Sequence, residues 1–520
     1  MNVLFAFQAT NPDISWSLIG PELIIGIAAV VVMMIDAFAR RDQRWLTGAA
    51  SLAALILAGV DSIWLWVTWP ATRTAYNGMI VLDELRLSFT LIFVVVSILT
   101  VLIAMAWIDT EHLPAGEFHA LLLFATCGMM LMASAGDLVI VFLGLEILSI
   151  ATYVMAGFRR SDVRSNESSL KYFILGSFAS AFLLYGIALI YGATATGPDS
   201  PGTTNIATIA ARVNQSIYPP LLLAGIAMMI VGFGFKIATA PFHVWTPDVY
   251  EGAPTPVTAF MAAGPKAAGF ASFLRVFLFG FPIATAAAAG TASYAHTSWV
   301  GALAIMAALT MTIGNVVAIV QNNVKRMLAY SSIAHAGYAL VGFVAAGAAA
   351  DSDQRSAALT GVAFYLLTYA IMNMGAFAIV TLMARSGDRR NQVDDYNGIG
   401  FDSPMLAFSL SLFLLSLLGL PLTAGFIGKV VVFSSALRQG YVWLVVLGVL
   451  NTAVSAYYYL RLIVVMFFRD RTTEWTAPRV PVSVAVALVI TILGVLYLGI
   501  FPSRIINAFS PRPTISISVR

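Results

Sequence analysis

The stretch that decides the fold is "MMIVGFGFKIATAPFHVWTPDVYEGAPTPVTAFMAAGPKAAGFASFLRVF", residues 228–277. It is apolar enough to lie in a lipid bilayer, yet it contains Lys236 and Lys266 and four prolines between positions 241 and 256. A proline removes a backbone hydrogen-bond donor and clashes with the preceding helical turn, so no helix runs straight through this segment. The stretch therefore predicts a membrane helix that breaks beside a buried lysine.

The composition of the whole chain indicates the same environment. Of 520 residues, 60% are hydrophobic and 10% are charged, whereas about a quarter of a soluble domain is charged. The chain is therefore predicted to be an all-α polytopic membrane protein. Its net charge of +3 is scattered over loops, so nucleic acid is not an expected partner. The first sixteen residues have no basic region or cleavage site, and no removable signal peptide is expected.

Fourteen apolar segments are long enough to cross a bilayer, which takes about 20 residues each. All of them are expected to be helical, because lipid offers no hydrogen-bond partners and a helix pairs its backbone N–H and C=O groups internally. The predicted spans are 17–39, 46–69, 85–108, 117–135, 137–158, 168–193, 218–240, 254–281, 298–321, 325–347, 356–384, 404–436, 440–468 and 480–501.

Basic residues in the connections predict the orientation. The connections after odd-numbered spans hold fourteen Lys and Arg residues, and the other face, with the C-terminal tail, holds eight. Because basic residues concentrate on the cytoplasmic side, the odd-to-even connections are predicted to be cytoplasmic. Both termini are then predicted on the outer, periplasmic face of a bacterial inner membrane.

The lysines are distributed unusually. The chain has five lysines among 28 basic residues, and four of the five lie inside predicted spans: Lys171, Lys236, Lys266 and Lys429. The fifth, Lys325, lies at the very edge of its span and is counted with the connections. A buried lysine can shift its pKa by several units and exchange a proton, whereas arginine stays charged. Charged residues at membrane depth normally face a bundle interior and are functional. The alternative, that a side chain reaches to the interface, is kept for Lys171, Arg275 and Arg461.

A second break is predicted in span twelve, 404–436, which is too long for one crossing and contains "GLPLTAGFIGK". "TAPF" at 239–242 resembles "TAGF" at 423–426, and "SIAT" at 149–152 resembles "SIAH" at 332–335, at offsets of 184 and 183 residues. The step from span seven to span twelve is odd, so the copies point in opposite directions. Discontinuous helices 7 and 12 in inverted repeats are typical of ion-coupled transporters.

These patterns divide the chain into four parts: helices 1–3 (1–116), a first five-helix repeat of helices 4–8 (117–281), a second repeat of helices 9–13 (298–468), and helix 14 with the tail (469–520).

Few other groups in the spans can carry a proton. Glu146 is the only carboxylate well inside its span, with a purely structural ion pair as the alternative. Histidine is the other exchangeable side chain: His335 is expected to link the two halves, and His243 to be a gate on the cytoplasmic side. His112, His119 and His296 lie at loops or span ends and are predicted to be solvated.

Electron transfer is not expected in this chain. The single cysteine, Cys127, cannot hold an iron–sulfur cluster, which needs about four ligands. The sequence has no convincing histidine pair for a haem, no Gly-rich nucleotide loop and no metal-ligand cluster. The chemistry available to it is proton transfer.

The block "FGFKIATAPFHVWTPDVYEGAPTPVTAF", with "GLEILSIATYVMAGF", "KRMLAYSSIAHAGY" and "GLPLTAGFIGK", resembles the antiporter-like membrane subunits of respiratory complex I. The likeness covers essentially the whole chain. Within that family the chain most resembles the subunit N branch of bacterial NADH-quinone oxidoreductase, the counterpart of mitochondrial subunit 2. Two features favour this branch: a lysine, Lys429, at the second break, and an end shortly after span fourteen.

The resemblance implies a proton-translocating subunit whose neighbours are other complex I membrane subunits. Glu146 and Lys236 would form a charge pair, Lys266 would be the central relay, and Lys429 would connect to the opposite face. Lys171 and His335 would be auxiliary members of this hydrophilic axis. NADH, FMN, iron–sulfur clusters and quinone would all be bound by other subunits.

Three alternatives stay open at the level of sequence. The same features suit a cation/proton antiporter without redox coupling, a membrane subunit of an energy-converting hydrogenase, or the plastoquinone version of the complex. A purely structural scaffold has little reason to keep Lys236, Lys266 and Lys429.

Overall fold

A computed structural model of the chain describes residues 15–40, 43–69, 71–197, 200–213, 216, 219–282, 291–384, 386–471 and 478–510. The N-terminal residues on which the signal-peptide expectation rests lie outside these ranges. So do four of the basic residues used for the orientation, namely Arg41, Arg385, Arg512 and Arg520.

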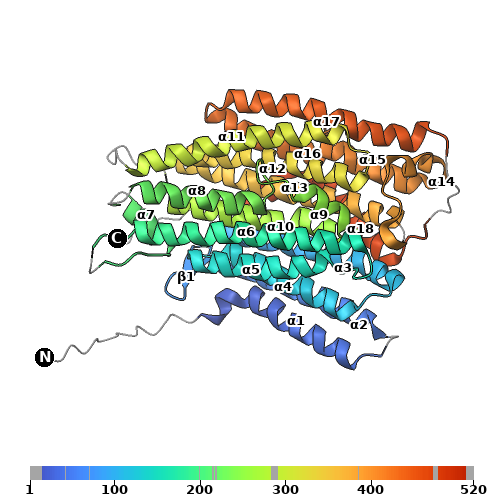
Figure 1. Cartoon of the computed structure of the whole chain (residues 1–520), viewed down its shortest axis with the longest axis horizontal. Helices are drawn as coiled ribbons and strands as arrows, with labels where there is room; N and C mark the ends of the chain where they lie inside the picture. Colours follow the sequence, from blue (N-terminus) through green and yellow to red (C-terminus); the bar gives the residue numbers. More distant parts are fainter. Residues whose placement is uncertain are drawn as a thin grey trace.

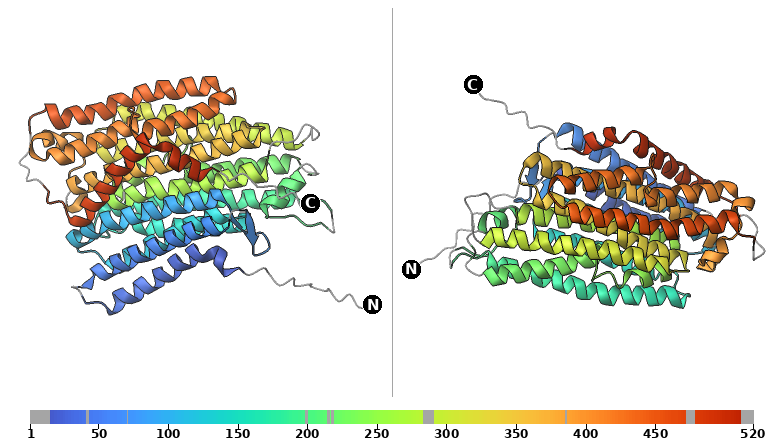
Figure 2. Two further views of the ribbon diagram at one scale, coloured as in Figure 1. Left: turned by 180° about the vertical axis from the view of Figure 1, so that it is seen from behind. Right: turned by 90° about the horizontal axis from the view of Figure 1, so that it is seen from above.

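The described chain is a bundle of long, nearly parallel helices (Figure 1). Helices α1 and α2 form one edge of the bundle and α11 and α17 the opposite edge, in both side views (Figures 1 and 2). The helices are α1 (Gly20–Phe38), α2 (Trp45–Thr68), α3 (Glu84–Glu111), α4 (Ala115–Ser134), α5 (Leu138–Ala156), α6 (Val163–Ala193), α7 (Ile206–Arg212), α8 (Pro219–Lys236), α9 (Thr246–Gly252), α10 (Thr255–Gly280), α11 (Thr291–Ile319), α12 (Val324–Ala348), α13 (Ser352–Ala384), α14 (Ile399–Asp402), α15 (Pro404–Leu418), α16 (Ala424–Arg438), α17 (Val442–Phe468), α18 (Val482–Ile500) and α19 (Pro502–Phe509).

Twelve helices of the described residues are long and apolar enough to cross a membrane. Helix α10 and the pair α15–α16 occupy the two further segments predicted as spans, 254–281 and 404–436. The all-α membrane fold is thus confirmed, while the count of fourteen crossings, the inverted repeats and the division into four parts remain predictions. The central helices α10, α12 and α13 are buried along most of their length, which places the interior of the bundle around them.

Both predicted helix breaks are present. Helix α8 ends at Lys236, a turn follows with Ala238 at φ 59°, and the short α9 begins at Thr246. Helix α15 ends at Leu418, Gly419 follows at φ 96°, and α16 begins at Ala424. A φ of 96° lies in the region that favours glycine, so Gly419 is a local reason for the second break. Each break leaves helix ends with free carbonyls inside the bundle.

Several small elements were not predicted. Strands β1 (Arg73–Ala75) and β2 (Ile80–Leu82) pair antiparallel across a turn that contains Asn77 and Gly78, both at positive φ. Short 3-10 helices are η1 (Trp16–Ile19), η4 (Ser386–Asp388) and η5 (Val393–Tyr396). The hairpin and α7 lie at one end of the bundle and α14 at the other (Figure 1).

Five residues predicted in connections or at solvated span ends are instead buried, and one of them is Arg159, which lies 3.3 Å from Glu111. Arg86 forms an ion pair of 2.8 Å with Glu22, and Lys325 one of 3.2 Å with Asp388. His119 lies 3.2 Å from the Thr47 hydroxyl, and His296 lies 3.0 Å from the Gly347 carbonyl. Each has a polar partner from another helix or loop. Hydropathy along the chain cannot predict such partners, because they come together only in the folded bundle. His112 is exposed, as predicted.

Candidate functional site

Lys236 is the last residue of α8, where the first break begins, and it is 6% exposed. Its ammonium donates a hydrogen bond of 2.9 Å to the Ser149 hydroxyl of α5 and lies 6.0 Å from the centre of the Tyr172 ring. A cavity of about 10 Å³, lined in part by Ser149, Tyr153, Ser180 and Lys236, lies beside it. This is room for about one water molecule among polar groups.

Lys266 lies in the middle of α10 and is 2% exposed. Its ammonium is 2.6 Å from the Ser332 carbonyl and 2.5 Å from the Ser332 hydroxyl of α12, and 5.9 Å from the centre of the Tyr369 ring. Helix α10 approaches the first break closely at Gly269, where a Cβ atom would lie 2.7 Å from Ile237. The glycine therefore lets Lys266 and Lys236 lie on packed neighbouring segments.

Lys429 lies in α16, just beyond the second break, and is 5% exposed. Its ammonium donates to the Leu417 and Leu418 carbonyls at 3.2 and 2.8 Å. These are the last carbonyls of α15, where the helix dipole attracts a positive charge. The ammonium also lies 4.8 Å from the centre of the Tyr338 ring.

His335 lies between Lys266 and Lys429, and its ring interacts electrostatically with both. It is 2% exposed, and its Nδ1 is 2.6 Å from the Tyr365 hydroxyl. Its ring contacts Tyr369, which faces Lys266, and Tyr338, which faces Lys429. The structure thus brings three lysines and His335 into one buried row, in the chain order of the two breaks.

The three lysines of this row share a kind of partner. Each ammonium is held by a serine or by backbone carbonyls and lies near one tyrosine ring. Among the described ion pairs, none joins a carboxylate to Lys236, Lys266 or Lys429 within 4.0 Å. Hydrogen bonds to neutral acceptors hold a charge less firmly than an ion pair does. The ammonium groups of the row are therefore held by neutral acceptors, without an ion pair to a carboxylate among the described residues.

Glu146 lies near Lys236 without forming a direct ion pair with it. The carboxylate interacts electrostatically with Lys236, but Ser149, three residues further along α5, accepts the hydrogen bond. Glu146 is half-buried, and its Oε1 has no hydrogen-bond partner among the described residues. The implied charge pair is thus present as a neighbouring charge rather than as a contact.

Lys171 and His243 lie outside the buried row. The Lys171 side chain is 41% exposed and pairs with Glu167 at 2.7 Å and Asp248 at 2.8 Å. His243 is half-buried in the turn between α8 and α9, and its Nδ1 has no partner among the described residues. The structure therefore places Lys171 in a surface ion network and His243 at the first break.

The two intramembrane arginines have structural partners. Arg275 is buried and forms an ion pair of 2.7 Å with Asp83, which precedes α3. Burial alone raises the pKa of Asp83, but the Arg275 guanidinium and the Arg86 amide outweigh it and hold that pKa below its usual value. Arg461 donates to the carbonyls of Ile319 and Gln321 at the end of α11. Neither arginine lies in the row of lysines.

Sequence reasoning missed the tyrosines of the site. Tyr172, Tyr338, Tyr365 and Tyr369 come from three helices and converge only through tertiary packing. It also missed the burial of Lys325. No group of three or more His, Cys, Asp or Glu side chains that could hold a metal ion occurs in the described part of the chain.

Broken membrane helices around a buried row of lysines define an antiporter-like membrane protein. The family model described as "NADH:quinone oxidoreductase/Mrp antiporter, TM" matches residues 135–455. The chain is 45% identical to NADH-quinone oxidoreductase subunit N of Trichlorobacter lovleyi over 509 residues, or 98% of each chain. It belongs to this family, in the subunit N branch.

Solved structures agree with this assignment. A chain of respiratory complex I from Thermus thermophilus is 34% identical, with a TM-score of 0.76 over 94% of this chain and 99% of that one. A chain of the Mrp complex from Dietzia sp. has a TM-score of 0.79 over 95% of this chain and 96% of that one, at 19% identity. The second likeness shows the shared fold alone.

Proposed function

We propose that this chain is the subunit N of a bacterial NADH-quinone oxidoreductase and that it moves protons across the membrane. The observation that carries the proposal is the buried row of Lys236, Lys266, His335 and Lys429, whose ammonium groups have neutral partners. Quinone reduction takes place elsewhere in the complex, and NADH, FMN, iron–sulfur clusters and quinone are bound by other subunits. The neighbours of this chain are the other antiporter-like membrane subunits.

The geometry suggests how the row is driven. A charge placed near Lys236, or a displacement of Glu146, changes the proton affinity of Lys236 and pushes its proton toward Lys266. His335 and its tyrosines pass the proton on to Lys429 at the second break. The carbonyls and helix ends freed at both breaks supply movable dipoles for these steps. Lys171 and His243 serve the cytoplasmic side of the first break.

The orientation is part of the proposal. The excess of basic residues in the connections supports an orientation with the α5–α6, α11–α12 and α13–α14 connections in the cytoplasm and both termini outside. The expected result is net proton transfer from the cytoplasm to the outer face of the bacterial inner membrane. The two five-helix repeats, 117–281 and 298–468, would each hold one of the breaks.

The test is a Lys236→Ala substitution in the assembled enzyme. NADH-driven proton pumping should fall sharply while the other subunits still co-purify with the chain. Undiminished pumping in an intact complex contradicts the proposal. Co-purification also separates it from the alternatives, because a cation/proton antiporter or an energy-converting hydrogenase brings a different set of subunits.

A further inference from the structure

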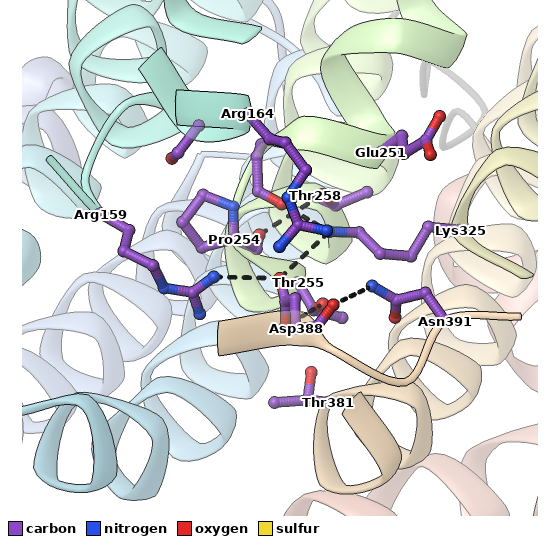
Figure 3. A network of polar contacts seen from close by, with 12 residues as sticks. Arg159, Arg164, Glu251, Pro254, Thr255, Thr258, Lys325, Thr381, Asp388 and Asn391 are labelled. Atoms are coloured by element: carbon purple, nitrogen blue, oxygen red, sulfur yellow. Dashed lines mark hydrogen bonds and ion pairs between the residues drawn. The ribbon is translucent and has the colours of Figure 1, made fainter. Parts of the chain in front are cut away.

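A cluster of buried charges outside the row of lysines joins the first turns of α10 and α12 to η4 (Figure 3). We call it the Asp388 cluster, after the carboxylate at its centre. Asp388 Oδ2 is 3.2 Å from the Lys325 ammonium and 3.7 Å from the Arg159 guanidinium. Asp388 Oδ1 accepts a hydrogen bond of 3.0 Å from the Thr255 hydroxyl. Lys325 is 0% exposed and Asp388 is 4% exposed.

Two cations share the Asp388 carboxylate, but they depend on it differently. Arg159 also lies 3.3 Å from Glu111 and 3.5 Å from Asp162. The Lys325 ammonium has one carboxylate, Asp388, and one carbonyl, Ala253 at 2.6 Å. If Lys325 gives up its proton, Arg159 remains beside Asp388, so the carboxylate keeps a counter-ion. The cluster therefore tolerates the neutral form of Lys325 better than a simple ion pair does.

Helix stability does not explain a lysine at position 325. Lys325 lies in the first turn of α12, where the helix dipole disfavours a positive charge. Its ammonium instead reaches the carbonyl of Ala253, the C-cap residue of α9, the short helix that follows the first break. Elsewhere the chain uses arginine for buried ion pairs, as at Arg86, Arg159 and Arg275. Arginine cannot release its proton, and lysine can.

A charged pocket of about 250 Å³ lies beside this region, and Gly252, the chain neighbour of Ala253, is part of its lining. It lies between α6, α9 and α12, and its carboxylates Asp248 and Glu251 are each 37% exposed. Arg326, which pairs with both, is the chain neighbour of Lys325. Its other charged members are Arg164, Glu167 and Lys171. Figure 3 shows Arg164, Glu251 and Lys325 around the same side of the cluster. The pocket therefore brings solvent and exchangeable carboxylates up to Arg326 and Gly252, the chain neighbours of Lys325 and of its acceptor Ala253.

Hydroxyl groups lead inward from the cluster to Lys266. Ser332, which holds Lys266, follows Lys325 by seven residues, so the two lie on one face of α12, roughly 10 Å apart along its axis. Beside this gap the Thr258 hydroxyl donates to the Tyr250 carbonyl at 2.9 Å, and the Tyr250 hydroxyl interacts with Ser332. All of these side chains are buried.

We propose that Lys325 is the residue that loads protons into the row from the predicted cytoplasmic side. Its neutral amine takes a proton from water or a carboxylic acid in the charged pocket and becomes an ammonium paired with Asp388. The proton then passes through hydroxyl groups and water to the neutral amine of Lys266, and Lys325 returns to the amine. Only N–H and O–H bonds form and break, so no further reactant is needed. This inference rests on the proposed function.

The experiment compares Lys325→Arg with Arg159→Lys in the assembled complex in membrane vesicles. Both variants keep two cations beside Asp388, but only the first removes the exchangeable amine. Pumping by Lys325→Arg should fall about a hundredfold, the low end of what a positioned acid–base group contributes, and Arg159→Lys should pump normally. A third variant, Lys325→His, keeps an exchangeable proton and should pump better than Lys325→Arg.

The dependence of pumping on the pH of the predicted cytoplasmic face distinguishes a loading role from a purely structural one, because a structural role of Lys325 would leave this dependence unchanged. With its loading residue absent, the complex should pump in proportion to the proton concentration on that face, about tenfold per pH unit, while the wild type changes little between pH 6 and 8. The charged groups that act on Lys325, namely Asp388, Arg159 and Arg164, are unchanged in Lys325→Arg, and so are the carboxylates of the pocket.

Two outcomes overturn the inference: Lys325→Arg pumps as well as the wild type or the histidine variant, or Arg159→Lys loses as much with the same pH profile. A parallel Lys266→Ala complex distinguishes a failure of the loading role of Lys325 from a failure of the proposed function. If Lys266→Ala stops pumping and Lys325→Arg does not, only the loading role of Lys325 fails. If Lys266→Ala pumps normally, the proposed function itself fails.

Discussion

Removing the Ser332 hydroxyl should slow proton transfer at the centre of the row. The Lys266 ammonium has three donors, and Ser332 accepts two of them, one at its carbonyl and one at its hydroxyl. Ser332→Ala leaves the carbonyl in place and removes the hydroxyl, which also interacts with the Tyr250 hydroxyl. A hydrogen bond to a charged group contributes about 1.5–3 kcal/mol. If the hydroxyl stabilises the transferring proton by this amount, its loss slows the step by a factor of roughly 10–150.

The assay is NADH-driven acidification of membrane vesicles, normalised to NADH oxidation with an artificial electron acceptor that measures the amount of enzyme. Ser272→Ala is the matched control, because Ser272 is equally buried on α10 and its hydroxyl bonds only to carbonyls of its own helix. Pumping by Ser332→Ala that equals pumping by Ser272→Ala refutes the role assigned to this hydroxyl.

Two further changes test the packing that supports the site. Arg275→Ala leaves the buried Asp83 carboxylate without its counter-ion and should destabilise the protein by about 3–5 kcal/mol, measured by thermal unfolding in detergent; a loss below about 1 kcal/mol would show that the pair is dispensable. Because the pKa of Asp83 is lowered in the fold, the pair stabilises the wild type above about pH 4 and this contribution is lost as the pH falls further; an unchanged difference between wild type and variant at pH 3 would contradict this. Gly269→Val forces a clash with Ile237, should separate α10 from the first break and should reduce pumping several-fold, whereas Gly301→Val, where the added atoms meet open space, should not.

The helix breaks and the buried lysines could be predicted because local chemistry determines both. Pro241 removes a donor wherever it lies, and a glycine such as Gly419 allows a φ that other residues resist. An intramembrane lysine is unfavourable unless it faces the bundle interior. The sequence therefore predicts Lys236, Lys266 and Lys429 as a group of buried lysines that face the bundle interior.

The partners of these lysines could not be predicted, because packing between distant segments determines them. Ser149 rather than Glu146 accepts the hydrogen bond of Lys236, and the two differ by less than one turn of α5. Tyr369 and Lys266 are about a hundred residues apart in the chain. Residues close to a span end were placed wrongly for the same reason: Lys325 was counted with a connection, but Asp388, the last residue of η4, packs against it and pairs with its ammonium.

The unpredicted β-hairpin had a usable signal. Asn77-Gly78 is a strong local pattern for a tight turn between two strands, and both residues have positive φ in the structure. The hairpin is short, with three residues in each strand. Its strands are too short to register in a hydropathy pattern that reports only segments long enough to cross the bilayer.

The most direct measurement of the central claim is NADH-driven proton pumping by the assembled complex that carries Lys266→Arg. Arginine keeps the positive charge beside Ser332 and Tyr369 but cannot release its proton. If the lysines work by exchanging protons, the arginine complex should assemble and pump as poorly as Lys266→Ala. Pumping at the wild-type rate would show that the charge alone is needed at this position and that Lys266 is not a proton carrier.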